Sequence, residues 1–262
     1  MKEKKIVKVM NFHSLIRVDA SRRQAMKYMR LEEEISEIID MIVNNRNFIL
    51  DKTIFKVNPD APPLNIYFGS DYGFCGSINF TINRMIEEDR DSDQIIIGRK
   101  LRSGNREPLL RISREDYKNS VKELYRILEG VIKNNSHSSV TIHYYQFNNI
   151  SSIEAVQKKI YPYDLQHHGA ENYREDYFVE GDMNTILRNL IINFLEYELR
   201  IAEVSSFASE NVLRQNSTTE SLKKIEEMEE EQFLQERKEK TEKGFKKVID
   251  SYMKKTFKGR KS

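Results

Sequence analysis

The stretch that decides the fold is MNTILRNLIINFLEYELRIAEVSSFA, residues 183–208. Its apolar side chains recur at alternating steps of four and three residues, at Met183, Leu187, Leu190, Phe194, Tyr197, Ile201, Val204 and Ala208. A repeat of about 3.5 residues is the seam of a left-handed coiled coil. The helical pattern continues without a proline from about Glu180 to Phe257. A helix of this length needs a partner helix or a partner protein, because most helical stability comes from packing.

A second long helical pattern, free of proline and glycine, runs from Lys2 to about Leu50. It carries two heptad-like stripes, the first at Ile6, Val9, His13, Ile16 and Ala20 and the second at Tyr28, Leu31, Ile35, Ile38 and Ile42. The polar patch Arg22-Arg23-Gln24 breaks the register between the stripes. We expect both stripes to pack antiparallel against the C-terminal helix, which is the coiled-coil pairing such stripes usually form.

The middle of the chain changes period. A proline-rich turn at residues 58–63 ends the first helix, because proline cannot continue it. Strands are predicted at 64–68, at 94–98 as a short buried strand, and at 139–147, with 156–161 as a candidate edge hairpin. Helices are predicted around 78–86 and 117–132. The predicted fold class is α/β: a long antiparallel coiled coil of the terminal helices plus a small Rossmann-like α/β domain with a mainly parallel sheet. The predicted parts are residues 1–57, 58–179 and 180–262.

Composition narrows the function classes. The 43 Lys and Arg nearly balance the 41 Asp and Glu, which gives no case for nucleic acid or an anionic membrane as partner. Charged residues are 32% and apolar residues only 39% of the chain, so much of the surface is expected to face solvent or a partner. A single cysteine excludes an internal disulfide and fits a reducing compartment. With no apolar run of membrane-spanning length and no signal-peptide pattern, the sequence predicts a cytoplasmic protein.

The glycine-rich turn GSDYGFCG, residues 69–76, lies between a predicted strand and a predicted helix, where phosphate-binding loops occur. Its spacing matches neither the dinucleotide fingerprint nor a Walker loop, and no Gly-Lys-Ser/Thr follows. A tight turn whose glycines permit close packing is therefore favoured over phosphate binding. Cys75 has no evident histidine or acid partner, which favours a small buried residue over a nucleophile.

The other polar candidates are weak. His167-His168 could ligate a metal, but no cysteine or carboxylate cluster has ligand spacing around them. Favourably ordered i,i+4 ion pairs are expected at Glu220–Lys224, Glu236–Lys240, Glu239–Lys243 and Glu242–Lys246. They indicate a solvated helix, or alternatively a polar rod that lies in a polar bearing formed by a partner. The basic end at 254–261 is interpreted as a frayed tail rather than a contact to an acidic partner. With no paired carboxylates and no nucleophile triad, the chain does not look like an enzyme on its own.

Several local motifs resemble one family. Residues 70–79 look like its Ser-Asp-x-Gly-Leu-Cys-Gly-x-x-Asn turn, and Gly98-Arg99-Lys100 is similar to its second-strand ending. Tyr145-Gln146-Phe147 with Ile160-Tyr161-Pro162 resembles a later strand and its end, and Ala208-Ser209-Glu210 with Arg214 fits Ala-Ser-Glu-x-x-x-Arg. This family is the gamma subunit, the central shaft, of F-type rotary ATP synthases. The resemblance covers nearly the whole chain and is strongest in the middle.

The resemblance implies a non-catalytic rotor. The terminal helices would lie inside a hexameric ring of alpha- and beta-type ATPase subunits, with the α/β domain outside the ring as the foot. Further implied partners are an epsilon-like subunit and a membrane rotor ring or other membrane apparatus, at the inner face of the cell membrane. No catalytic, cofactor-binding or metal-binding residue is expected. The family motif residues are Ser70, Asp71, Gly73, Cys75, Gly76, Asn79, Gly98, Arg99 and Lys100, and the candidate shaft contacts are Ser209, Glu210, Arg214 and Arg237.

The chain also departs from the family pattern. After Arg214 the family's Met-rich segment is replaced by residues 215–221, QNSTTES, and the N-terminal pattern is absent around Phe12 to Ala25. The departures imply bearing and foot contacts that differ from those of a standard synthase. The lack of tryptophan and the richness in Asn, Ile and Lys suit a divergent F-type-like ATPase of a wall-less bacterium. Two alternatives stay open: the shaft of a specialised motor that drives gliding motility or another membrane apparatus, and a coiled-coil scaffold. A nucleotide-binding enzyme using the glycine-rich turn is the least favoured reading.

Overall fold

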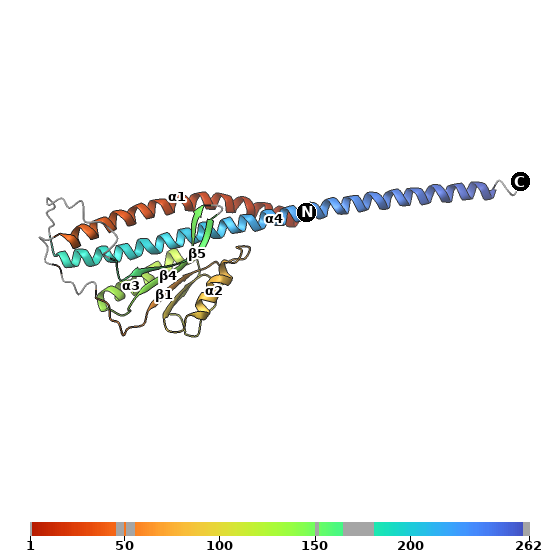
Figure 1. Cartoon of the computed structure of the whole chain (residues 1–262). Helices are drawn as coiled ribbons and strands as arrows, with labels where there is room; N and C mark the ends of the chain where they lie inside the picture. The colour runs from red at the N-terminus through yellow and green to blue at the C-terminus, as the bar shows by residue number, and fades with distance from the viewer. Residues whose placement is uncertain (1, 46–49, 51–55, 150–151, 165–180, 259–262) are drawn as a thin grey trace. The chain divides into compact units, whose positions relative to one another are not determined.

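The computed structural model describes residues 2–45, 50, 56–149, 152–164 and 181–258 (Figure 1). Two compact units share these residues. The larger is Phe12–Ser217, and the smaller joins Met1–Asn11 to Thr218–Ser262. Nine helices and strands are described, in the order α1 Lys2–Asn44, β1 Leu64–Phe68, α2 Ile78–Glu88, β2 Asp93–Ile97, β3 Leu110–Ile112, α3 Tyr117–Asn134, β4 Val140–Asn149, β5 Ser152–Tyr161 and α4 Met183–Lys258. Among them, no helix is both long and apolar enough to cross a membrane.

The larger unit is built on a five-stranded sheet in the order β3-β2-β1-β4-β5. Strand β1 lies parallel to β2 and β4, and β2 lies parallel to β3. Strand β5 pairs antiparallel with β4, in the register Tyr145 opposite Ala155. The predicted fold class and edge hairpin are therefore confirmed. Strand β3 was not predicted, because three residues are too few to show a period.

The two faces of the sheet carry separate cores. Strand side chains alternate in direction, so Leu64, Ile66 and Phe68 join the core that includes α1, α3 and α4. Tyr67 and Ile96 face the opposite way and pack on α2 through Ile82. Figure 1 shows α2 on one side of the sheet and α4 on the other, beside α1. The result is a three-layer arrangement around a mostly parallel sheet.

Helix α4 is packed from several sides within this unit. All eight predicted seam positions from Met183 to Ala208 are buried or half-buried, as expected of a coiled-coil seam. Positions off the seam, including Leu195, Leu199 and Ala202, are buried as well, in the core that α4 shares with the sheet. Helices α1 and α4 pair antiparallel. The Tyr28 ring of α1 lies 6.2 Å from the Tyr197 ring of α4, and Arg17, earlier on α1, lies 6.0 Å from the ring of Phe207, later on α4.

The predicted register of α1 is wrong in its first half. Ile6, Val9, His13, Ile16 and Ala20 are exposed, and the buried positions of the same stretch are Ser14, Val18 and Ser21. Small side chains let two helices approach closely, so the contact face here is small and polar and does not follow the apolar period. In the second stripe Ile42 is buried, but Ile38 is 40% exposed and Ile39 is fully buried in its place. Helix α1 also ends earlier than predicted, at Asn44.

The smaller unit repeats the antiparallel pairing with polar contacts. Lys4 Nζ lies 2.7 Å from Glu229 and 3.3 Å from Glu226. The Asn11 amide donates hydrogen bonds to the hydroxyls of Thr218 and Thr219, at 3.0 and 2.7 Å. Two of the predicted ion pairs lie within salt-bridge distance, Glu220–Lys224 at 3.5 Å and Glu239–Lys243 at 3.4 Å. These exposed pairs contribute only about 0.3–0.5 kcal/mol each. His167 and His168 lie outside the described residues.

Two neighbouring isoleucines test the corrected register of α1. Ile39→Ala should lower the free energy of unfolding by about 2–5 kcal/mol, because it leaves a cavity at a fully buried position. Ile38→Ala is the matched control and should change it by less than about 1 kcal/mol, since that side chain is 40% exposed. Urea unfolding followed by circular dichroism measures both. Equal losses for the two variants would contradict the register.

Candidate functional site

The glycine-rich turn, residues 69–76, follows β1 at the carboxyl edge of the parallel strands and is closed by its own side chains. The Ser70 N–H donates to Asn79 Oδ1 at 2.9 Å, and the Tyr72 N–H donates to Ser70 Oγ at 3.1 Å. The Asn79 amide also donates to Cys75 Sγ at 3.3 Å. A phosphate loop needs free backbone N–H groups, and these two already have partners. The geometry favours the tight-turn interpretation.

Asp71 ties this turn to the loops that follow β2 and β3. Its buried carboxylate accepts the Arg99 N–H at 2.8 Å and the Arg114 N–H at 3.1 Å on Oδ1. Oδ2 accepts the Glu115 N–H at 3.2 Å. Three backbone donors from two loops therefore converge on one side chain. An anion that accepts several N–H groups is well stabilised, and its removal would leave those donors without partners.

Gly98 allows the close approach of β1 and β2 at this edge. Its φ of +129° lies in a region that L side chains rarely adopt, and an added Cβ would lie 2.9 Å from the carbonyl carbon of Gly69. Both observations require glycine. The next residue, Arg99, pairs with Glu115 at 3.0 Å, and the Lys100 N–H donates to the Ser70 carbonyl at 3.1 Å. The Gly98-Arg99-Lys100 motif thus packs directly against the turn.

Cys75 is buried in the turn. Its thiol contacts the Tyr72 carbonyl at 3.5 Å. Burial raises the pKa of the thiol, so it is protonated at neutral pH. A nucleophilic cysteine needs the opposite, a depressed pKa with an accessible sulfur. This supports the interpretation of Cys75 as a small buried residue.

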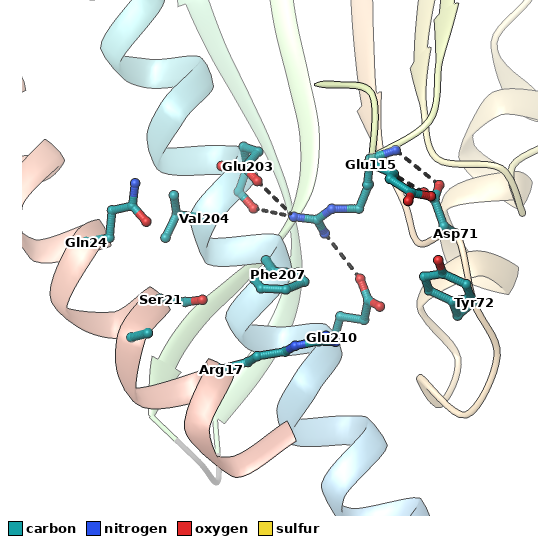
Figure 2. Close-up of a pocket in the computed structure, with 12 residues that line it drawn as sticks. Arg17, Ser21, Gln24, Asp71, Tyr72, Glu115, Glu203, Val204, Phe207 and Glu210 are labelled. Atoms are coloured by element: carbon teal, nitrogen blue, oxygen red, sulfur yellow. Dashed lines mark hydrogen bonds and ion pairs between the residues drawn. The ribbon is translucent and has the colours of Figure 1, made fainter. Parts of the chain in front are cut away.

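A cluster of buried charges joins the α/β part of the larger unit to α4 (Figure 2). The Arg114 guanidinium donates to the Glu203 carbonyl at 2.8 Å and lies 3.3 Å from the carboxylates of both Glu203 and Glu210. Glu210 also pairs with Arg214, one turn further along α4. Arg214 reaches the Gly73 carbonyl of the turn at 3.5 Å. The side chains of Arg114, Glu210 and Arg214 are each less than a tenth exposed.

A cavity of about 510 Å³ opens beside this cluster. Figure 2 shows Arg17, Ser21 and Gln24 of α1 on one side of it and Asp71 and Tyr72 on the other. The Phe207 ring stands between two guanidinium groups, Arg114 at 4.9 Å and Arg17 at 6.0 Å from its centroid. These are cation–π contacts, which add to the attachment of α4 at this point.

The structure brings most of the predicted motif residues together. Those on the turn and on Gly98-Arg99-Lys100 share the edge just described, and Glu210 and Arg214 contact it from α4. Ser209 instead donates to the Tyr145 carbonyl of β4 at 3.2 Å. Arg237 belongs to the smaller unit and lies 5.8 Å from the Phe233 ring. Their role as contacts to a surrounding ring stays a prediction.

Sequence reasoning missed Arg114 and Glu203, which complete the charge cluster. Arg114 lies in a short loop between β3 and α3 that shows no periodic signal, and Glu203 is one of many glutamates on a charged helix. A chain with 32% charged residues gives no means of telling which charges will be buried. Across the described residues, no group of three or more metal-ligating side chains occurs.

Glu210 is the first residue to test in this cluster. Glu210→Gln should lower the free energy of unfolding by about 3–5 kcal/mol, because it leaves two buried guanidinium groups without their shared carboxylate. The control Glu220→Gln removes an exposed ion pair and should change stability by less than about 1 kcal/mol. Denaturant titration gives both values. A loss as small as that of the control would show that the cluster adds little to stability.

Gly98→Ala should lower the free energy of unfolding by at least about 1–3 kcal/mol, because it combines backbone strain with a 2.9 Å approach to Gly69. Gly130→Ala is the matched control, since a Cβ there meets nothing within 4 Å and the residue lies inside α3. That control should raise stability by about 0.5–1 kcal/mol. Thermal unfolding should show a lower melting temperature for Gly98→Ala and a higher one for Gly130→Ala. An unchanged melting temperature for Gly98→Ala would show that the backbone at this edge of the sheet can relax.

The chain matches one family model and a curated relative. A family model described as ATP synthase matches residues 2–242. The ATP synthase gamma chain of Mycoplasmoides gallisepticum is 26% identical over 101 residues, which cover 38% of this chain and 35% of that protein. The match thus spans about a third of the length of that curated relative.

Two solved structures share the fold. The first belongs to the central stalk and c-ring of the Tetrahymena thermophila mitochondrial ATP synthase, with a TM-score of 0.56 and 16% identity over 82% of this chain and 99% of that one. The second belongs to the rotor of the Euglena gracilis mitochondrial ATP synthase, with a TM-score of 0.55 and 16% identity over 91% and 93% of the two chains.

Proposed function

Because the chain belongs to the ATP synthase gamma family, whose model it matches over residues 2–242, we propose that it is the central shaft of an F-type or F-type-like rotary ATPase. It is non-catalytic by itself. ATP is hydrolysed or synthesised on a surrounding hexamer of alpha- and beta-type subunits, and the shaft couples those reactions to rotation. In a standard synthase that rotation drives or is driven by proton transport.

The observation that carries this proposal is the distal part of α4. Every residue from Glu231 to Ile249 is exposed, including Phe233, Leu234, Phe245 and Val248. Large apolar side chains on a single helix have no core of their own, and exposed apolar surface of this kind marks an interaction site. Partner subunits that enclose the helix would cover these apolar side chains and supply the core that the helix lacks.

The larger unit supports the same proposal through the outer face of α1. Phe12, Leu15, Ile16, Met26 and Met29 are each at least half exposed there. At about 100° per residue these positions fall on one side of α1, so that side is apolar and exposed. Only a shaft with unequal faces can favour different conformations of successive ring subunits, because a ligand that contacts all states equally shifts none of them.

In this proposal the parts divide the work as follows. Residues 1–57 and 180–262 supply the shaft, and residues 58–179 form the foot outside the ring. The foot takes an epsilon-like subunit and a membrane rotor ring or other membrane apparatus as partners, which places the complex at the inner face of the cell membrane. The c-ring named in the Tetrahymena structure supports such a partner for the foot. Gly73 of the motif and Arg114 hold the foot to α4. No cofactor or nucleic acid is required.

Truncation of α4 tests the proposal against a scaffold function. In a complex reconstituted with the alpha- and beta-type subunits, a chain ending at Ser221 should lower ATP turnover by about tenfold or more, the usual size of an allosteric coupling. The measurement is the steady-state ATPase rate of complexes shown to be assembled by size-exclusion chromatography. Unchanged turnover in an assembled complex would contradict the shaft and favour the scaffold.

A variant of full length tests whether the apolar side chains of α4, and not only its length, are needed for ATP turnover. Phe245, Val248 and Ile249 are spaced at i, i+3 and i+4, on one side of α4. Replacing all three with serine should lower turnover in the same assay, since it removes that apolar side but keeps the full chain. The matched control replaces Lys243, Lys246 and Lys247 with serine. A control that is as impaired as the test variant would show that charge matters more than apolar contact.

A further inference from the structure

Strand β4 extends beyond its parallel neighbour β1. Past the end of β1, helix α4 lies along that edge of β4. The last pair between β1 and β4 joins Tyr67 to His143, yet β4 continues to Asn149. Its backbone groups on that edge have no strand to bond to beyond His143. Buried backbone N–H and C=O groups nevertheless need partners, because a buried polar group without a hydrogen bond is destabilising.

Three serines of α4 supply those partners. Ser206 Oγ accepts the Tyr145 N–H at 3.2 Å, and Ser209 Oγ donates to the Tyr145 carbonyl at 3.2 Å. Ser205 Oγ accepts the Phe147 N–H at 2.8 Å. All three serines are buried. We call Ser205, Ser206 and Ser209 the serine ladder, because their hydroxyls continue the hydrogen bonding of the sheet onto the helix.

Ion pairs hold α4 close to the ladder. Lys158 of β5 bonds to the buried carboxylate of Glu198 at 2.6 Å. Arg114 pairs with Glu203, before the ladder, and with Glu210, directly after it. Residues 198–210 of α4 are therefore attached to β4, to β5 and to the loop before α3 by directional bonds. Apolar packing on the sheet has no such directionality.

We propose that the serine ladder is the element that transmits torque between α4 and the α/β domain. This inference rests on the proposed function. A one-residue slip of a helix moves its side chains by about 1.5 Å along the axis and about 100° around it. Such a slip breaks every bond of the ladder at once, so the ladder resists both rotation and sliding of α4 against β4. Ser205, Ser206 and Ser209 act as positioning residues that keep the shaft and the foot turning together.

The first arm of the test needs only the chain itself. In the variant Ser205→Ala/Ser206→Ala/Ser209→Ala, amide hydrogen exchange at Tyr145 and Phe147 should become about 10–100-fold faster, since each factor of ten corresponds to about 1.4 kcal/mol. Ser120→Ala, a half-buried serine on α3, is the control and should leave those amides unchanged. If the triple variant does not fold, Ser205→Ala alone tests the shortest bond and Ser205→Thr, which keeps a hydroxyl, should restore protection at Phe147.

The second arm measures rotation in the assembled complex. A probe is attached to the α/β domain through Arg84→Cys, an exposed position on α2, and its rotation is followed with and without viscous load. This arm uses Ser205→Ala/Ser206→Ala, which removes two bonds of the ladder and leaves the candidate ring contact Ser209 unchanged. Without load, this variant should hydrolyse ATP and turn the probe as the parent complex does. Under load, hydrolysis should continue while probe rotation falls by about half or more, which is the sign of slip between shaft and foot.

The outcomes distinguish failure of the torque role of the serine ladder from failure of the proposed function. Equal rotation under load for the double variant and the parent would overturn the torque role and leave the serines with a structural one. Unchanged amide exchange in the triple variant would overturn the ladder itself. A parent complex that hydrolyses ATP without turning the probe would instead overturn the proposed function together with the torque role.

Discussion

The buried carboxylate of Glu210 is the contact on which the larger unit depends. It accepts Arg114 from the loop before α3 and Arg214 from its own helix, and Arg214 in turn reaches the glycine-rich turn. Removing charges from water is costly, so a cluster of this kind is stable only when every member is paired. Asp71 does the same for the backbone of the neighbouring loops. Two acidic side chains thus fix the carboxyl edge of the sheet and the helix that crosses it.

Helix α4 meets two different environments along its length. In the larger unit it is buried on successive sides by α1, the sheet and the charge cluster. From Glu231 to Ile249, in the smaller unit, it is exposed throughout. Its helical form there agrees with local propensity and i,i+4 pairs, which are weak. The buried part is stabilised by the chain's own packing, whereas the exposed part depends on the surrounding ring in the function proposed above.

The sequence allowed the element order apart from β3, the mainly parallel sheet and the seam of α4 to be predicted, because each follows from a strong period. The motif from Ser70 to Asn79 could likewise be placed at a strand-to-helix turn. The register of α1 could not, since its buried face carries Ser14 and Ser21 while its apolar residues face outward. Arg114 and the serine ladder were also out of reach. Their partners lie at least 58 residues away along the chain, and serines and charges carry no sign of which of them will be buried.

The burial of Cys75 has a consequence for chemistry at the surface. The thiolate is the form that oxidants and alkylating agents attack, and this thiol is held protonated inside the turn against the Tyr72 carbonyl. As Cys75 is the only cysteine in the chain, changes in cellular redox state find no accessible sulfhydryl in the folded larger unit. In the function proposed above, coupling through α4 would therefore not respond to oxidation at cysteine, and a thiol introduced on the surface would be the reactive one.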